Sequence, residues 1–416
     1  MPTNSDAATF FVNSSQDVND LEPGNGLCVA YLFVHPPYVL PFCTLRGAIE
    51  ETNKLPGPDT INIPEGTFTL TLSGTGEDNA YAGDLDITDS LKIVGAGVNK
   101  TKIDANGLDR VFDILDPSSN VTISGLTIIN GTLQEGEDNL EGGGGIRNNA
   151  TLSLRRIAMS TNSVESEEMG NGGAILNQAT CTITGSTIED NVAGNGGGIF
   201  NDDNASLDLS SSTIHANSAE TGAGLSNQGS ARLVNVTING NIANLGNSPH
   251  GGGILNSADM ELLQSTVAGN ATSGQGGGIS NNGIISMVNT IIANNVNGNC
   301  SAAEGLFSLG FNLESRNSCG LDQETDLINL DPELEILRYN GGPTKTMAIN
   351  IWSPAIDKGK NLVEEGIFTD QRGEERPSGD AYDIGAYERL KISIVPILAP
   401  LLLSDKSGQN MLRPQK

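Results

Sequence analysis

Basic residues are scarce in this chain. Its 416 residues include 22 Lys and Arg against 50 Asp and Glu, which gives a formal net charge of −28. Nucleic-acid binding requires a basic face that neutralises phosphates, so this charge argues against a nucleic-acid partner. Charged residues of both signs make up only 17% of the chain, which is too apolar a composition for a disordered polypeptide.

Long apolar runs are also lacking. The longest, ISIVPILAPLLL at residues 392–403, contains two prolines and falls short of the ~20 residues that a membrane-spanning helix needs. We therefore expect no integral membrane span, and we interpret this run as a terminal strand or the remnant of an attachment segment. The start, MPTNSDAATFFVNSS, lacks the basic segment and apolar core of a signal peptide, so an export signal would lie outside this numbering.

Cysteine is rare, and its positions are informative. Cys28 and Cys43 flank one short loop, and Cys300 and Cys319 flank another. Two local pairs favour disulfides and an oxidising compartment, where each bridge stabilises the fold by about 3 kcal/mol. This predicts the disulfides Cys28–Cys43 and Cys300–Cys319 in a secreted or cell-surface protein. The fifth cysteine, Cys181, is expected to be a free thiol.

Glycine, by contrast, is abundant at 52 residues, and it marks a repeat. The stretches GGAILNQATCTITGSTIEDN from Gly172 and GGGILNSADMELLQSTVAGN from Gly251 follow one pattern. The apolar residue after the glycines recurs six times, at Ile146, Ile175, Ile199, Leu225, Ile254 and Ile279. An Asn follows two residues later in every copy, at Asn148, Asn177, Asn201, Asn227, Asn256 and Asn281.

The pattern within each copy predicts the fold. Polar and apolar residues alternate, and Thr, Val and Ile are frequent, which is typical of β-strands. Short strands separated by Gly and Asn at a period of about 25 residues indicate a β-solenoid. Connections between parallel strands of one sheet are almost always right-handed. We therefore expect an all-β chain that forms a single-stranded, right-handed parallel β-helix. The recurring Asn residues are expected to be structural, in turns or in a hydrogen-bonded ladder along the stack.

The same alignment predicts which side chains face the core. Cys181 occupies the slot of Leu152, Leu207, Met260 and Ile284, which indicates a buried and unreactive thiol. Near the end of each copy, an Asn also follows three residues after an apolar position. These residues are Asn162, Asn191, Asn217, Asn241, Asn270 and Asn294.

The repeats divide the chain into four segments. Residues 1–60 are expected to form an N-terminal cap, in which CTLRGAIEETN (43–53) forms a short amphipathic helix with Leu45, Ala48 and Ile49 on one face. Residues 61–300 hold the solenoid coils, residues 301–390 the last coils and an irregular C-terminal cap, and residues 391–416 a tail. Caps are needed because an open solenoid end exposes core side chains and unpaired strand edges.

Several of these segments resemble known families. CTLRGAIEETN resembles the "CSLREA" N-terminal motif, with Thr44 and Gly47 as departures. DITDSLKIVGAG, NGGPTKT, SPAIDKG and DQRG…DIGAYE are similar to right-handed parallel β-helix proteins with a choice-of-anchor Q C-terminal region, and the GGGI/GGAI spacing is similar to polymorphic outer-membrane protein repeats. The resemblance implies a secreted or surface-attached bacterial or archaeal protein, and it implies no particular reaction.

A catalytic centre is not expected. Asp202 and Asp203 are adjacent, and His215 lies one strand later, but neighbouring strand residues point to opposite faces and no basic pair follows them. Between residues 171 and 300 the single basic residue is Arg232, which argues against binding of an anionic polymer. Asp202, Asp203 and His215 are therefore the only catalytic candidates. Arg110 is expected to form a structural ion pair with Asp109 or Asp113, since lone charged pairs are usually surface features, and Arg372 and Arg376 are expected to tether the C-terminal cap to acidic neighbours.

Two acidic stretches are candidates for Ca²⁺, the one cofactor that we keep as a hypothesis. GTGEDNAYAGDLD (74–86) contains Asp84 and Asp86, and EGEDNLE (135–141) contains Glu135, Glu137 and Asp138. Neither has the spacing of an EF-hand loop or of the nonapeptide calcium repeat.

Three functions stay open at this point. The first is a structural, adhesive or matrix protein without a catalytic centre, whose partners are further copies of itself or extracellular glycans. The second is a carbohydrate-active enzyme, either a polysaccharide lyase or a glycoside hydrolase of the pectate-lyase-like type. The third is a module that binds neutral glycans along faces rich in Asn, Thr and Ser.

Overall fold

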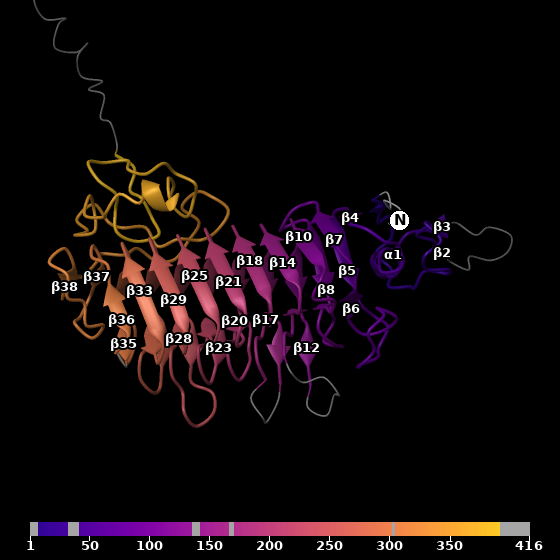
Figure 1. Cartoon of the computed structure of the whole chain (residues 1–416), viewed down its shortest axis with the longest axis horizontal. Helices are drawn as coiled ribbons and strands as arrows, with labels where there is room; N and C mark the ends of the chain where they lie inside the picture. Colours follow the sequence, from indigo (N-terminus) through magenta and orange to yellow (C-terminus); the bar gives the residue numbers. More distant parts are fainter. Residues whose placement is uncertain (1–6, 32–40, 135–141, 166–169, 302–303, 392–416) are drawn as a thin grey trace, which may run out of the picture.

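The chain winds into a right-handed parallel β-helix with an irregular body packed along its side (Figure 1). The computed structural model describes residues 7–31, 41–134, 142–165, 170–301 and 304–391. Three long parallel sheets run along the solenoid, and each complete coil contributes one strand to each of them. The predicted fold class is therefore confirmed. No helix among the described residues is long and apolar enough to cross a membrane.

Sheet 1 has eleven strands, which are β1 (Thr9–Phe11), β4 (Asp59–Ile63), β7 (Leu91–Gly95), β10 (Asn120–Ser124), β14 (Thr151–Arg155), β18 (Thr180–Thr184), β21 (Ser206–Ser210), β25 (Ser230–Val234), β29 (Asp259–Leu263), β33 (Ile284–Val288) and β36 (Leu306–Ser308). Sheet 2 also has eleven, which are β5 (Gly66–Thr69), β8 (Thr101–Asp104), β11 (Thr127–Ile129), β15 (Ala158–Ser160), β19 (Thr187–Glu189), β22 (Thr213–His215), β26 (Thr237–Asn239), β30 (Thr266–Ala268), β34 (Ile291–Ala293), β37 (Leu313–Glu314) and β38 (Leu327–Ile328).

Sheet 3 has nine strands, which are β6 (Leu85–Ile87), β9 (Phe112–Ile114), β13 (Ile146–Asn148), β17 (Ile175–Asn177), β20 (Ile199–Asn201), β24 (Leu225–Asn227), β28 (Ile254–Asn256), β32 (Ile279–Asn281) and β35 (Cys300–Ser301). Two short parallel sheets flank it, formed by β12 (Thr132–Leu133) with β16 (Ser163–Val164), and by β23 (Ser218–Ala219), β27 (Ile242–Ala243) and β31 (Ala271–Thr272). The pair β2 (Ala30–Tyr31) and β3 (Pro41–Phe42) is antiparallel.

The core is filled by aliphatic side chains stacked in register. The six apolar residues that define the repeat pair with one another in sheet 3, and all are fully buried. Cys181 pairs with Leu152 and Leu207 in sheet 1 and is also fully buried. Burial raises the pKa of the Cys181 thiol to about 12, because the thiolate loses its solvation. The structure thus places this thiol in the core as a small apolar group.

The alignment of the last copy is wrong by one residue. Ile285, and not Ile284, pairs with Met260, and Ile284 is half exposed. The error has a simple cause, because both positions are isoleucine and the apolar pattern does not reveal which of them faces inward. The same shift applies to the second Asn row, in which Asn295 is buried while Asn294 is exposed with a φ of 58°.

Two asparagine ladders run along the stack. In the first, the side-chain amide of each Asn donates to the next, from Asn148 through Asn177, Asn201, Asn227 and Asn256 to Asn281, at 2.7–2.9 Å. In the second, Asn162, Asn191, Asn217, Asn241, Asn270 and Asn295 are joined at 2.9–3.1 Å. These contacts satisfy buried polar atoms at the solenoid corners, where an apolar side chain would leave backbone groups unpaired.

The N-terminal cap contains the predicted helix. α1 (Leu45–Thr52) begins at Thr44, whose hydroxyl accepts a hydrogen bond from the Gly47 N–H at 2.9 Å. The helix is buried on every side and is not amphipathic in its exposure. Its polar face is covered because Arg46 forms an ion pair with Asp17, at 2.6 Å, in the segment that precedes the helix.

Both predicted disulfides are present. Cys28 is bonded to Cys43 in the N-terminal cap, and Cys300 is bonded to Cys319 at the last coils. The two bridges therefore lie near opposite ends of the solenoid, where fraying of coils would begin. Such bonds are typical of proteins in oxidising compartments.

Residues 331–389, which we call the C-terminal cap, lie along the side of the solenoid (Figure 1, yellow). They contain the short 3₁₀ helix η1 (Val363–Glu365) and otherwise irregular backbone. The cap contacts successive coils through Ser211, Asn235 and Asn289. It covers an outward apolar row made of Val234, Leu263 and Val288. The equivalent positions in the four preceding coils are Ser210, Thr184, Arg155 and Ser124. That apolar row explains why the cap packs at this side.

Candidate functional site

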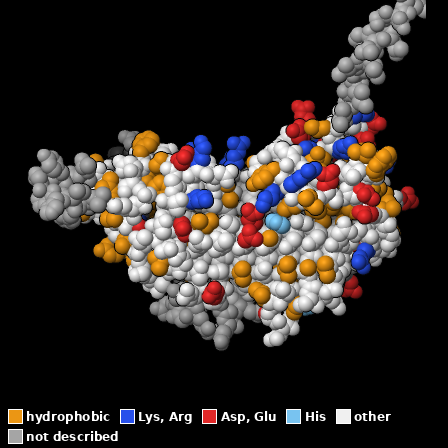
Figure 2. Space-filling view, turned by 180° about the vertical axis from the view of Figure 1, so that it is seen from behind, with side chains coloured by type: hydrophobic (Ala, Val, Ile, Leu, Met, Phe, Trp, Pro, Cys, Tyr) orange, Lys and Arg blue, Asp and Glu red, His pale blue; other side chains and the backbone are white. Residues whose placement is uncertain are grey.

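A groove opens where the C-terminal cap ends along the solenoid wall. The corner between sheets 1 and 2 is covered by the cap from Ser211 onward, where the Thr344 hydroxyl donates to the Ser211 carbonyl at 3.2 Å. In the preceding coils the same corner lines two adjoining hollows of about 620 and 610 Å³. Figure 2 shows Lys and Arg side chains around this hollow. We call it the basic groove, and its main lining residues are Lys102, Gly125, Arg155, Arg156, Gly185, Tyr339, Pro343 and Arg372.

The floor of the groove is shaped by glycines on either side of an arginine. Gly125, Arg156 and Gly185 occupy equivalent corner positions in three successive coils, all with positive φ. A Cβ at Gly185 would lie 3.6 Å from the Arg156 Cγ and 3.7 Å from the Pro343 Cγ, so a side chain there would fill the space beside Arg156. The glycines therefore leave the guanidinium group of Arg156 accessible within a hollow.

The cations of the groove come from distant parts of the chain. Lys102 belongs to β8, Arg155 ends β14, and both side chains are exposed, as is that of Arg156. None of these three has an ion-pair partner within the described ranges. Arg155 makes one contact, from its Nε to the Ser153 hydroxyl at 3.2 Å. Three cations thus remain available to a ligand.

The carboxylates of the groove are already engaged. Glu189 accepts from the Lys345 ammonium at 2.6 Å, and Asp370 is paired with Arg372 at 2.8 Å. Arg372 also stacks over the Tyr387 ring, with its guanidinium carbon 3.8 Å from the ring centroid. Tyr339, at 65% exposure, presents an aromatic face at the groove wall. The groove therefore offers available cations and an aromatic surface beside neutralised acids.

This arrangement can bind an anion. Guanidinium groups form paired, charge-assisted hydrogen bonds with carboxylate, sulfate or phosphate groups, and Arg155 and Arg156 supply two of them side by side. Lys102 adds a point charge at the far end of the groove. The corner positions of three coils span ~10 Å at a strand spacing of about 4.8 Å, so the groove suits a ligand longer than one small ion.

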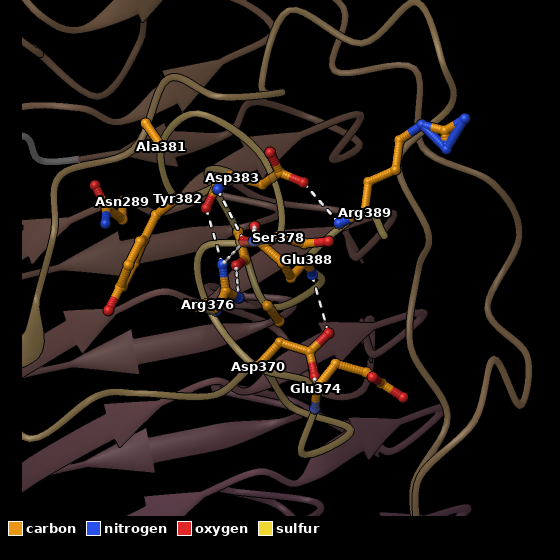
Figure 3. A network of polar contacts seen from close by, with 12 residues as sticks. Asn289, Asp370, Glu374, Arg376, Ser378, Ala381, Tyr382, Asp383, Glu388 and Arg389 are labelled. Carbon is orange, nitrogen blue, oxygen red and sulfur yellow. Dashed lines mark hydrogen bonds and ion pairs between the residues drawn. The ribbon is translucent and has the colours of Figure 1, made fainter. Parts of the chain in front are cut away.

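A buried network holds the wall of the groove in place (Figure 3). Arg376 is fully buried and donates to the Glu388 carboxylate at 2.9 Å and to the Gly385 carbonyl at 2.7 Å. Asp383 accepts backbone N–H groups from Asp357 and Arg389 at 2.8 and 2.6 Å, while the Arg389 side chain points away from the network (Figure 3). Burial raises the pKa of Asp383 to about 7, and nearby Glu388 adds to the rise. The role predicted for Arg372 and Arg376, contact with acidic neighbours in the cap, agrees with these contacts.

The sequence-derived catalytic candidates lie elsewhere. Asp202 and Asp203 occupy the turn after β20 in sheet 3, where Asp202 accepts from the Gln178 amide at 3.1 Å. His215 lies on β22 in sheet 2, with its Nδ1 2.9 Å from the Asn239 carbonyl oxygen. The structure thus places the two aspartates and the histidine on different sheets.

The calcium candidates fall into two groups. Asp84 and Asp86 are buried beside β6, and Asp113 of β9, which the sequence did not suggest as a ligand, joins them. Burial raises the pKa of Asp84 well above its usual range and that of Asp86 to about 7. Glu135, Glu137 and Asp138 lie outside the described residues.

The ion pair expected at Arg110 is present, and it is buried rather than exposed. Arg110 pairs with Asp113 at 2.5 Å as predicted, but both side chains are only 2% exposed. The pair is buried because outward residues of the first coils in sheet 3 are covered by the segment around Ala80 and Asp84, which local sequence does not reveal.

The basic groove was missed by sequence reasoning. The scarcity of cations between residues 171 and 300 is real, but Lys102, Arg155, Arg156 and Arg372 all lie outside that window. The pair Arg155-Arg156 was the available signal. It stands at a corner where the neighbouring coils have Ser124-Gly125 and Thr184-Gly185.

Comparisons with known proteins add little to this description. No family model matches the chain, and no curated protein matches it. Among solved structures, the chain is similar to pectate lyase Pel9A, with 13% sequence identity and a TM-score of 0.49 over 93% of this chain and 98% of that one.

Proposed function

We propose that this chain is an extracellular adhesive β-helix protein that binds an acidic glycan in the basic groove. The observation that carries the proposal is the gathering of the exposed side chains of Lys102, Arg155 and Arg156 at one hollow of a chain whose net charge is −28. Exposed cations on such an acidic surface attract anions only where they are concentrated, because elsewhere the carboxylates repel them.

The chemistry of the groove favours a uronic-acid or sulfated sugar polymer. Arg155 and Arg156 match the geometry of a carboxylate or sulfate group, and the Tyr339 ring offers a flat surface for a sugar ring. Because the groove extends over the corners of three coils, it has room for more than one sugar residue. This revises the expectation drawn from residues 171–300, since the cations that hold the polymer lie outside them.

The residues of the groove favour binding of a polysaccharide over its cleavage. Cleavage of a polysaccharide requires an available carboxylate or another base within reach of the sugar. Glu189, the acid that lines the groove, is held in an ion pair with Lys345, and Asp370 is buried behind the wall in an ion pair with Arg372. A binding role uses only the available cations.

An extracellular or surface location is part of the proposal. The two disulfides support it, because such bonds persist in oxidising compartments. The likeness of CTLRGAIEETN and DQRG…DIGAYE to the CSLREA and choice-of-anchor Q motifs of surface-attached proteins supports it as well.

Calorimetric titration with polygalacturonate oligomers tests the proposal. The variant Arg155→Ala/Arg156→Ala should bind at least tenfold more weakly than the parent chain, because two charge-assisted contacts at about 1.5–3 kcal/mol each are removed. Binding of the parent chain should weaken with added salt, and neutral dextran should not bind.

A charge-matched control separates this site from general electrostatics. Arg232→Ala/Arg316→Ala removes two exposed arginines outside the groove and should leave the affinity unchanged. Equal losses in both variants would contradict the proposal. Steady release of reducing ends or unsaturated sugars by the parent chain would favour the enzyme instead.

A further inference from the structure

Four aspartates lie together at the N-terminal end of sheet 3. Asp86 of β6 pairs in register with Asp113 of β9. One carboxylate oxygen from each of Asp84, Asp86 and Asp113 lies within 4.8 Å of the other two. Asp109 lies close enough to raise the pKa of Asp84. We call these four residues the aspartate cluster.

All four are buried, and none is more than 6% exposed. Asp113 is the best satisfied of them, because its Oδ1 accepts from the Arg147 Nε at 2.9 Å and its Oδ2 from Arg110. The nearest oxygen of Asp84 lies 3.7 Å from the Arg110 guanidinium. The two arginines thus face one side of the cluster.

Asp86 is the least satisfied member. Its side chain is 0% exposed, and its Oδ2 accepts one hydrogen bond from the Ala80 N–H at 2.6 Å. Its Oδ1 has no hydrogen-bond partner in the part of the chain that the structure describes. A fully buried carboxylate oxygen without a donor is costly, so such an atom in a group of acids calls for a positively charged partner.

The charges of the cluster also call for a positively charged partner. The three carboxylates that lie within 4.8 Å of one another, those of Asp84, Asp86 and Asp113, outnumber the two guanidinium groups beside them, Arg110 and Arg147. Glu77 and Asp78, nearby, add further negative potential at Asp86. Excess charge of one sign is strongly destabilising in a buried site, and one divalent cation would neutralise it.

We propose that the aspartate cluster binds one divalent cation, with Ca²⁺ as the best fit. Carboxylate oxygens are the preferred ligands of hard cations, and Ca²⁺ holds them at 2.3–2.6 Å, so two oxygens that share one ion are at most about 5 Å apart. The spacing within 4.8 Å satisfies this limit. Ca²⁺ also accepts irregular ligand geometry more readily than Mg²⁺ does.

The site would lock the N-terminal cap onto the first coils. Arg46 of α1 donates to the backbone carbonyls of Ala80, Gly83 and Asp84 at 2.8–3.0 Å. The same short segment carries Asp84 and ends at Asp86. A cation that fixes these two aspartates therefore also fixes the carbonyls that hold the helix. This inference is independent of the groove and its ligand.

Equilibrium dialysis of the full chain against radioactive Ca²⁺ and thermal unfolding test the inference. The parent chain should retain one Ca²⁺. Its Tm at neutral pH should be about 2 °C or more higher in roughly 5 mM Ca²⁺ than in EDTA, a concentration above the usual dissociation constants of extracellular calcium modules. The variant D86N, which keeps the shape of the side chain, should lose both effects.

Asp208→Asn provides the control, because Asp208 is an exposed aspartate on the outer face of sheet 1 and should keep both effects. If D86N fails to fold, the number of Ca²⁺ ions that each parent chain binds still tests the inference. Absence of bound Ca²⁺ and of a Tm shift in the parent chain would overturn the inference and leave protons as the neutralising charge. Retention of both effects in a folded D86N variant would also overturn it.

Discussion

Ile284 and Ile285 are neighbours of the same type that lie in opposite environments. Ile285 is fully buried in the solenoid core beside Met260 in register, while Ile284 is 50% exposed on the outer face of sheet 1. Since successive side chains of a strand point to opposite faces, a shift of one residue exchanges the two environments. This pair therefore reports the register of the last coils.

Substitution of each isoleucine by aspartate tests this register. Ile285→Asp should lower the free energy of unfolding by several kcal/mol, because it buries a charge without a partner, whereas Ile284→Asp should change it by less than about 1 kcal/mol. Urea unfolding followed by circular dichroism measures both. Equal effects, or a larger effect at Ile284, would show that the register is wrong.

The asparagine ladders show what residue-level reasoning could and could not predict. The recurrence of Asn148 and its five equivalents was visible in the sequence, and Asn side chains in register stack well through amide–amide hydrogen bonds. The choice between Asn294 and Asn295 was not visible, since both are asparagine. Only the pairing of β30 with β34 distinguishes the ladder residue from the exposed one.

At the scale of the element, the C-terminal cap is held by buried ion pairs and contains the only tryptophan. Asp370, Arg376, Asp383 and Glu388 are each buried within it. Trp352 itself is 79% exposed, so its indole ring lies outside this buried network. The pKa of Asp383 is raised to about 7 by burial, and that of Glu388 is raised for the same reason.

The raised pKa values predict that the cap is more stable in mild acid. A carboxyl group whose folded-state pKa lies above its unfolded value contributes stability that is fully present below the unfolded value of about 4 and is lost as pH rises through the folded value. For Asp383 this window runs from about pH 4 to about 7. The urea midpoint of the cap, followed by hydrogen exchange of residues 370–388, should therefore be higher at about pH 5 than at about pH 8.

Two variants test whether Asp383 causes this dependence of stability on pH. Asp383→Asn removes the titrating group and should flatten the dependence on pH, by up to about 1.4 kcal/mol for each unit of pKa shift. Asp380→Asn changes an exposed aspartate paired with Lys391 and should preserve the dependence. A midpoint that rises with pH between about 5 and 8 would contradict the raised pKa of Asp383.

The position of this element was only partly predictable. The acidic and basic residues around Arg376 indicated a tethered body at the end of the chain. Its packing along the side of the solenoid depends on the apolar row Val234, Leu263 and Val288, which faces outward. In the sequence these residues look like ordinary strand residues, because their facing becomes clear only with the register.

At the scale of the whole molecule, the solenoid is a stack in which each coil contacts its neighbours. In such a stack stability is close to a sum of local terms, and unfolding begins at the ends. The disulfides Cys28–Cys43 and Cys300–Cys319 lie in those end regions. They restrain the places where fraying would start.

Reduction of the disulfides should therefore act locally. Hydrogen exchange followed by mass spectrometry should become faster in residues 41–63 and 300–328 after reduction, while residues 175–260 keep their protection. The comparison requires the same chain under oxidising and reducing conditions. A uniform increase along the whole solenoid would contradict this view and indicate global unfolding.

The sequence by itself determined the stacked β-helix, its buried aliphatic slots, its asparagine ladders, the capping helix and the two disulfides. These features are local or periodic. The slots and ladders recur in every copy of the repeat, and the helix and the disulfides each depend on a short segment of sequence. Tertiary structure alone decided the basic groove and the aspartate cluster. Lys102 and Arg155 approach each other through the stacking of coils, and Tyr339 and Pro343 join them only because the C-terminal cap folds back along the coils. Asp86 and Asp113 become neighbours only through the stacking of one coil on the next, which also removes them from water.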